Sequence, residues 1–158
     1  MFRKSSEDIS DIDEYFAAVN EKLLEARRND DPNITVNVKE DGDIYDTMDY
    51  EFIPDEEALG EWEAVDFLRK IDDFDPEEQY WQGGNLFWKY VKFYEDGTVI
   101  SNLRIGQWTK GYIWQNDTIP SYTIKNIDGE KYMFIQWKSG DYTIRRTKPL
   151  YYVFKKIG

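Results

Sequence analysis

Residues 86–104 read LFWKYVKFYEDGTVISNLR, and this stretch carries the pattern that decides the fold class. Its two apolar runs are rich in aromatic and β-branched residues, which favour strands. Between the two runs lies Glu95-Asp96-Gly97, which is typical of a tight turn. The stretch therefore predicts two antiparallel strands, 86–94 and 98–104, joined as a hairpin.

The same pattern continues on both sides of this hairpin. Further short runs of similar composition predict strands over 62–68, 110–115, 122–127, 131–138, 142–146 and 150–156. Turn signals such as Asp128-Gly129 separate neighbouring runs. This series of consecutive strands suits an up-and-down barrel or a strongly curled sheet. We predict the eight-stranded antiparallel up-and-down β-barrel over residues 60–158, because closing the sheet removes its exposed edges.

Residues 1–59 form a separate predicted unit. Apolar residues at steps of three and four predict one amphipathic helix over 9–28. Alternating residues over 34–38 and 44–53, with Asp41-Gly42 between them, predict an accessory hairpin. The expected fold class is therefore all-β with one N-terminal helix. The apolar face of that helix either packs on its own domain or binds a protein partner or a second copy of the chain.

Charge is unevenly divided between the two units. The chain has 32 acidic and 20 basic residues, and its net charge is −12. Residues 1–59 hold 18 of the acidic and 6 of the basic residues, so this unit carries the whole imbalance. An acidic protein repels the phosphates of nucleic acids, and we therefore expect no nucleic-acid partner.

The composition excludes several classes of chemistry. Neither cysteine nor histidine occurs, which removes disulfides, thiolate nucleophiles, imidazole catalysis and the usual zinc, haem and iron–sulfur ligands. The sequence also lacks a nucleophile elbow and a phosphate-binding glycine loop. We therefore expect no catalytic residues, no metal site and no cofactor, and we expect that the protein is not an enzyme.

The apolar residues are spread along the chain in short runs. No run approaches the length of about 18 residues that a membrane-spanning helix needs, and no apolar stretch follows the basic residues near the N-terminus. We therefore expect no membrane partner and a cytoplasmic location.

The segment Gly60-Glu61-Trp62 follows a short acidic turn and opens the first predicted barrel strand. This Gly-x-Trp resembles the opening of lipocalins and their calycin relatives. The resemblance extends to a lipocalin-like module of Gram-positive bacteria, found alone or as the C-terminal tail of sensor and regulatory proteins. It covers roughly residues 44–156 and rests on the segments 62–67, 108–111, 137–145 and 149–153.

The resemblance implies a barrel that encloses one small apolar molecule, or a folded appendage that recognises something for a neighbouring domain. It also implies that Trp62, just after Gly60, plugs one end of the barrel. A cation from the last strands covers the indole ring in such barrels, and Lys155 or Arg145 is the expected residue. The resemblance implies no catalytic residue.

Aromatic residues of the predicted strands are the candidates for a ligand site. Eight-stranded barrels are just wide enough to be filled by side chains or to hold one small guest. The candidate lining residues are Trp88, Tyr90, Trp108, Trp114, Tyr132, Trp137 and Tyr151. Two alternatives stay open: these rings line a cavity for an apolar or aromatic ligand, or they fill the interior themselves.

Asp66 lies between Val65 and Phe67 on the first predicted strand, where a carboxylate is costly unless it is paired. It either orients a ligand inside the barrel, with Lys138 or Arg145 opposite, or forms an ion pair that sets the strand register. The sequence thus favours a non-catalytic small-molecule-binding or sensory module. The alternative is a protein-interaction module that uses the N-terminal helix or the acidic hairpin.

Overall fold

The computed structural model describes residues 31–38, 40, 44–79, 86–114, 118–137 and 150–158. Three expected elements lie outside the described residues: the helix over 9–28, the turn at Asp41-Gly42 and the strand over 142–146. Two expected site residues, Lys138 and Arg145, also lie outside them.

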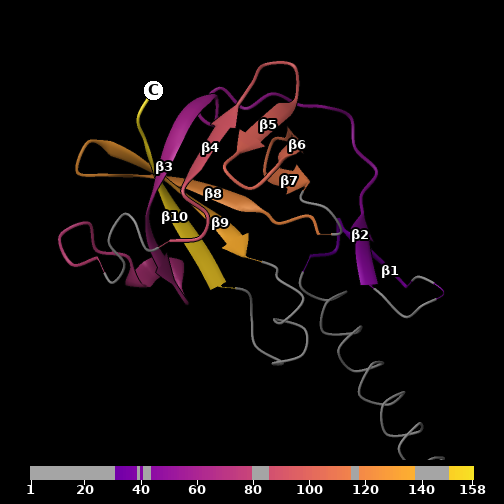
Figure 1. The fold of residues 1–158 in the computed structure, drawn as a ribbon, viewed down its shortest axis with the longest axis horizontal. Coiled ribbons are helices and arrows are strands. Elements are labelled where there is room, and N and C mark those ends of the chain that lie inside the picture. The colour runs from indigo at the N-terminus through magenta and orange to yellow at the C-terminus, as the bar shows by residue number, and fades with distance from the viewer. Residues whose placement is uncertain (1–30, 39, 41–43, 80–85, 115–117, 138–149) are drawn as a thin grey trace, which may run out of the picture.

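Eight antiparallel strands form the main sheet in the described part of the chain, and this confirms the all-β prediction (Figure 1). The strands are β3 (Gly60–Leu68), β4 (Tyr90–Phe93), β5 (Thr98–Ser101), β6 (Ile105–Thr109), β7 (Tyr112–Trp114), β8 (Tyr122–Ile127), β9 (Glu130–Trp137) and β10 (Leu150–Lys156). Their order is β7-β6-β5-β4-β3-β10-β9-β8, so the first and last strands after residue 60 are neighbours.

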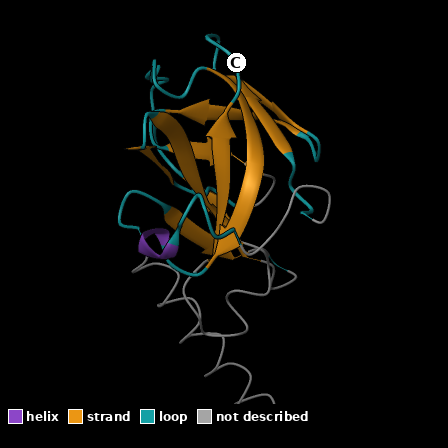
Figure 2. Cartoon of the chain, turned by 90° about the vertical axis from the view of Figure 1, so that its left-hand side faces the viewer, coloured by secondary structure: helices purple, strands orange, loops and turns teal. Residues whose placement is uncertain are grey.

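The sheet curls into a half-barrel (Figure 2). Its edge strands β7 and β8 meet at an isolated bridge between Tyr112 and Ser121. Beside this bridge, the amide of Tyr122 donates a hydrogen bond of 2.9 Å to the carbonyl oxygen of Gly111. Beyond Tyr122, no strand of the described chain lies along the outer edge of β8. Among the described residues, β7 and β8 therefore touch only near Tyr122, and the expected barrel is present as a curled half-barrel rather than as a closed one.

Strand β6 interrupts the expected pattern. The sequence predicts strands over 98–104 and 110–115, whereas the structure turns at 101–104 and again at Lys110-Gly111. The hydroxyl oxygen of Ser101 accepts hydrogen bonds of 3.1 Å from the Leu103 amide and 3.2 Å from the Arg104 amide. The boundaries predicted here are wrong because this local hydrogen bonding ends β5 before the apolar run is complete.

The accessory hairpin is present as a separate two-stranded sheet. Its strands β1 (Thr35–Val38) and β2 (Ile44–Thr47) pair in antiparallel register. The returning strand ends at Thr47 rather than at the expected Ile53, and the following residues run to the main sheet instead. There, the Lys110 amide donates a 2.8 Å hydrogen bond to the Ile53 carbonyl oxygen.

Apolar side chains pack on both faces of the strands β3, β9 and β10. The concave face holds the inner cluster, which consists of Ala58, Trp62, Ala64, Leu86, Trp88, Val91, Phe93, Val99, Trp108, Ile113, Tyr122, Met133, Ile135, Tyr152 and Phe154. The convex face holds the outer cluster of Leu68, Tyr132, Phe134 and Val153, which the residues Ile71 and Phe74 help to cover. Ile71 opens the short 3₁₀ helix η1 (Ile71–Asp73).

A bulge in β3 distributes its side chains between these two faces. Val153 lies opposite Asp66 but Phe154 lies opposite Ala64, so Val65 is the extra residue. The extra residue reverses the alternation of the strand. Ala64 therefore faces the inner cluster, whereas Asp66 shares the outer face with Val153.

Candidate functional site

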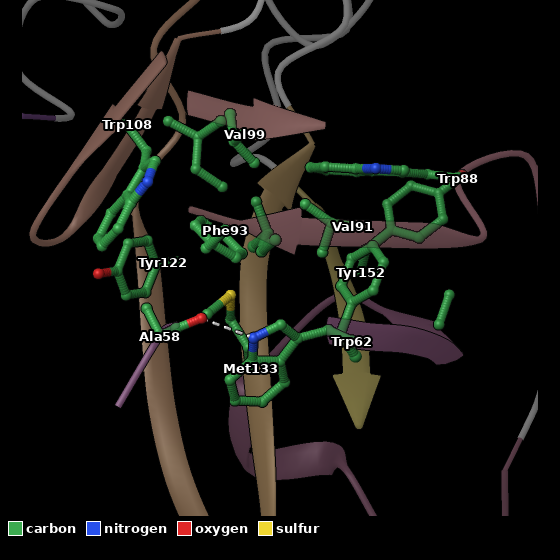
Figure 3. Close-up of a cluster of buried hydrophobic side chains, with 14 of the residues drawn as sticks. Ala58, Trp62, Trp88, Val91, Phe93, Val99, Trp108, Tyr122, Met133 and Tyr152 are labelled. Carbon is green, nitrogen blue, oxygen red and sulfur yellow. Dashed lines mark hydrogen bonds between the residues drawn. The ribbon is translucent and has the colours of Figure 1, made fainter. Parts of the chain in front are cut away.

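Aromatic rings fill the concave side of the sheet (Figure 3). The Trp88 ring, which is fully buried, lies 5.0 Å from the Phe154 ring and 5.5 Å from the Tyr152 ring, measured between centroids. At the other side of the cluster, Phe93 packs edge-on against Trp108 at 5.2 Å. Such tilted and edge-to-face pairs stabilise a packed core. Of the two interpretations of these aromatics, this packing favours the one in which they fill the interior.

A small cavity remains between Trp88 and β7. Its volume is about 10 Å³, and that is close to the space that a single water molecule needs. Trp88 is one of its lining residues, and the Trp88 Nε1 donor has no hydrogen-bond partner among the described residues. A bound water would satisfy this donor, whereas an apolar or aromatic molecule is far larger than the cavity.

The structure brings only some of the expected lining residues together. Trp88, Trp108 and Trp137 meet in or against the inner cluster. Tyr132 belongs to the outer cluster and Tyr151 packs against it, because odd and even residues of a strand face opposite ways. Tyr90 lies on the convex side beside Glu61 and Lys92, and Trp114 packs on the ring of Tyr50 at a centroid distance of 4.2 Å. Tyr90, Tyr132 and Tyr151 therefore lie apart from the inner cluster, whereas Trp114 also lines the small cavity beside Trp88.

Trp62 closes the concave side near the start of β3. Its ring is fully buried, and its Nε1 donates a 2.8 Å hydrogen bond to the Ala58 carbonyl oxygen. Gly60, at the start of the strand, has a φ of +107°, and a Cβ there would collide with the carbonyl oxygen of Gly158. Trp62 is thus held within the inner cluster, and its expected role as the plug of a barrel stays a prediction.

The cation over Trp62 is Lys156 and not the expected Lys155. The Nζ of Lys156 lies 5.2 Å from the centre of the Trp62 ring and donates a hydrogen bond to the Leu59 carbonyl oxygen. Lys155 lies opposite Glu63 and points to the other face, because β10 alternates and Phe154 and Lys156 both face inward. Burial lowers the pKa of Lys156, and the nearby Lys131 lowers it further.

Asp66 lies on the convex face and is fully buried. One of its carboxylate oxygens, Oδ1, accepts a 2.9 Å hydrogen bond from the Phe67 amide. The bulge at Val65 places this carboxylate away from the interior of the curled sheet, so the expected role as a ligand anchor inside it has no geometric support. Its expected partners Lys138 and Arg145 lie outside the described residues.

An open cleft lies where the seam between β7 and β8 meets the turn before β3. We call it the mouth cleft. Its volume is about 670 Å³, and it is lined by Pro54, Asp55, Glu56, Glu57, Lys110, Gly111, Tyr122 and Ile124. These residues come from three separate segments of the chain, 54–57, 110–111 and 122–124.

Tyr122 and Asp55 form the inner wall of the mouth cleft. The Tyr122 hydroxyl donates a 2.8 Å hydrogen bond to Asp55 Oδ2. Burial raises the pKa of Tyr122, and the adjacent Asp55 carboxylate adds to this rise, so the phenol stays protonated as a donor at neutral pH. Glu56 and Glu57 are exposed, and they leave this wall strongly acidic.

Sequence reasoning missed the mouth cleft. The acidic turn over 55–57 was visible in the sequence, whereas residues 110 and 111 were predicted to begin a strand. Nothing in either segment indicates that both reach the start of β8, because the two turns meet only through the tertiary fold.

Other acidic groups show no arrangement for chemistry. The Glu61 carboxylate forms an ion pair of 3.3 Å with Lys92, and Glu63 is exposed on the same face. Asp72 and its neighbours are exposed, and the described residues contain no group of three carboxylates placed to hold a metal ion. Within the same described residues, no helix has the length and apolar character that crossing a membrane requires.

No family model, curated protein or solved structure matches the chain.

Proposed function

We propose that the chain is a non-catalytic recognition module of lipocalin-like architecture, which binds a cationic partner at the mouth cleft. The observation that carries this proposal is the contrast between the two candidate spaces. The cleft is open and has about 670 Å³, whereas the cavity beside Trp88 has about 10 Å³. A partner therefore reaches the cleft without displacing any core side chain.

Two features support the lipocalin-like architecture. The first and last strands of the main sheet, β3 and β10, pair over most of their length. At the end of this pairing, Lys156 covers the ring of Trp62. Both features agree with a barrel whose end is plugged by an indole beneath a cation, and the seam between β7 and β8 is the part of such a barrel that stays open among the described residues.

Charge favours a cationic partner. Asp55, Glu56 and Glu57 supply three carboxylates to the cleft, while Lys110 supplies one ammonium group. The net charge of −12 over the whole chain adds a long-range attraction for cations. The apolar side of Ile124 and the ring of Tyr122 offer contact area to the carbon chain of a lysine or arginine.

A titration with tetralysine, followed through backbone amide shifts, tests this proposal. We expect the largest shifts at Gly111, Tyr122 and Ile124, and no comparable shifts with tetraglutamate. The double variant Glu56→Gln, Glu57→Gln should weaken binding by about fivefold, which corresponds to roughly 1 kcal/mol of lost charge attraction.

The matched control for this titration is Glu77→Gln, Glu78→Gln, which removes two exposed carboxylates from the loop after η1. It should leave the affinity nearly unchanged. Equal losses in both double variants would mean that tetralysine responds to the overall charge alone, and the mouth cleft would not be its site.

A further inference from the structure

The backbone of β8 has one side that faces away from β9. The Tyr122 amide marks this side, because it donates its hydrogen bond to Gly111 of the β6–β7 turn. Backbone groups of alternate residues point to the same side of a strand. The amides and carbonyls of Ile124 and Asn126 therefore point away from β9, in the plane of the sheet, as those of Tyr122 do. The backbone groups of Thr123 and Lys125 point to β9.

Past Tyr122, no strand of the described part of the chain pairs with the edge of β8 that faces away from β9. β8 ends the strand order of the sheet, and neither Ile124 nor Asn126 has a backbone partner there among the described residues. The opposite edge strand, β7, differs, because the Ile113 amide donates a 3.0 Å hydrogen bond to the Pro120 carbonyl oxygen. Among the described residues, the β7 edge of the curled sheet is thus covered, whereas the β8 edge has no neighbouring strand past Tyr122. We call this part of the edge, residues 123–127, the free edge of β8.

The free edge of β8 continues the mouth cleft. Ile124 belongs to both, and Lys110-Gly111 marks the end at which the cleft meets the seam. An extended chain laid along the edge would enter the cleft with its next residues and meet the carboxylates of Asp55, Glu56 and Glu57. Edge strands recruit extended peptides in this way, with main-chain hydrogen bonds for affinity and side-chain contacts for specificity.

From this juxtaposition we propose that an extended, lysine- or arginine-rich peptide segment binds by adding a further strand to the free edge of β8. The inference rests on the proposed function and specifies the class of partner and its backbone conformation. A second copy of the same chain is disfavoured as the occupant, because each copy carries a net charge of −12 and the same acidic cleft wall.

Amide hydrogen exchange of the 158-residue chain, with and without the peptide Lys-Val-Lys-Val-Lys-Val-Lys, tests the proposal. In the free protein, the Ile124 and Asn126 amides should exchange quickly, while Thr123 and Lys125 are already protected by β9. Saturation with the peptide should slow the exchange of Ile124 and Asn126 by about tenfold or more, because both become hydrogen-bonded. Unchanged exchange at saturation would overturn the inference.

A matched pair of variants at an exposed position provides the second measurement. Asn126→Pro removes the outward amide without breaking a hydrogen bond to β9, whereas Asn126→Ala keeps the amide and removes only the side chain. We expect Asn126→Pro to bind the peptide about tenfold more weakly and Asn126→Ala to bind it nearly as the parent does. Equal affinities would contradict strand addition, and the exchange experiment decides the matter if Asn126→Pro does not fold.

The outcomes separate this inference from the proposed function. If the peptide binds, and Glu56→Gln, Glu57→Gln weakens it while Asn126→Pro does not, the cleft function stands and strand addition fails. If no basic peptide binds at millimolar concentration, both fail. A dimer in the absence of peptide that Asn126→Pro abolishes would assign the edge to a second copy and overturn the inference.

Discussion

The hydroxyl of Tyr122 donates a 2.8 Å hydrogen bond to Oδ2 of Asp55, which lies 67 residues earlier in the chain. Tyr122 begins the edge strand β8, and Asp55 lies in the turn that leads into the central strand β3. The Tyr122 ring also packs on Phe93 of the inner cluster, at a centroid distance of 5.9 Å. One side chain therefore joins the core of the sheet to the wall of the mouth cleft.

Removing the Tyr122 hydroxyl tests this connection. Tyr122→Phe keeps the ring in the inner cluster and leaves Asp55 without this donor. We expect the free energy of unfolding at pH 7, measured by chemical denaturation, to fall by about 1 kcal/mol. Tyr94→Phe removes a hydroxyl from an exposed ring and should change it by less than about 0.5 kcal/mol. Equal losses would show that the Asp55 bond contributes nothing specific.

The same side chain predicts a dependence of stability on alkaline pH. Burial, reinforced by Asp55, raises the folded-state pKa of Tyr122 above the ordinary value of 10.0. The protonated phenol therefore stabilises the folded state fully below about pH 10, and this contribution is lost as the pH rises toward the raised pKa. Between about pH 9 and about pH 11, the unfolding free energy should fall more steeply for the parent than for Tyr122→Phe. Parallel pH profiles would contradict the shift.

The cation over Trp62 predicts different effects for two adjacent lysines. Lys156→Met removes both the contact with the Trp62 ring and the hydrogen bond to Leu59. We expect the unfolding free energy to fall by about 1 kcal/mol and the tryptophan emission to change. The loss is no larger because the variant no longer has to bury an ammonium group. Lys155→Met, on the opposite face, should change neither by much. A larger effect of Lys155→Met than of Lys156→Met would mean that Lys155 is the cation over Trp62, as the resemblance implies.

Truncating Phe74 measures how much the residues that cover the outer cluster contribute to stability. Its ring lies 4.9 Å from the Tyr132 ring and 5.6 Å from the Phe134 ring, between centroids. Phe74→Ala should lower the unfolding free energy by about 2 to 3 kcal/mol, because it exposes apolar surface of β9. Phe87→Ala is the control, since Phe87 is 65% exposed and should cost under about 1 kcal/mol. Similar thermal melting of both variants would mean that residues 71–74 do not cover the sheet.

The packed interior predicts a response to indole that depends on a core mutation. In the parent protein, millimolar indole should leave the melting temperature unchanged, because the cavity beside Trp88 has only about 10 Å³. Trp88→Ala removes a fully buried ring, and indole should raise the melting temperature of this variant by refilling the space. An equal rise in the parent would favour an apolar ligand inside the sheet. If Trp88→Ala does not fold, the parent measurement alone decides between the two interpretations.

Local signals in the sequence predicted the elements that depend on neighbouring residues. Asp128-Gly129 forms the expected turn, with φ of 53° at Asp128 and 85° at Gly129, and Gly97 has φ of +88° in the turn after β4. Strand composition likewise predicted most of the main sheet and both strands of the hairpin. Ser101 marks the limit of such reasoning, because its side chain ends β5 within an apolar run.

The amino-acid sequence by itself determined the all-β class, the antiparallel hairpins, the acidic character and the absence of cysteine and histidine chemistry. These depend on composition and on patterns that repeat every two residues. Tertiary structure alone decided that Asp66 faces outward, that Lys156 covers Trp62, and that three separate segments enclose the mouth cleft. The alternation of side chains along a strand says only that neighbouring residues face opposite ways. The single extra residue at Val65 reverses which residues of β3 face the inner cluster. Where a bulge falls, and which turns meet, depends on the strands that pair across the fold.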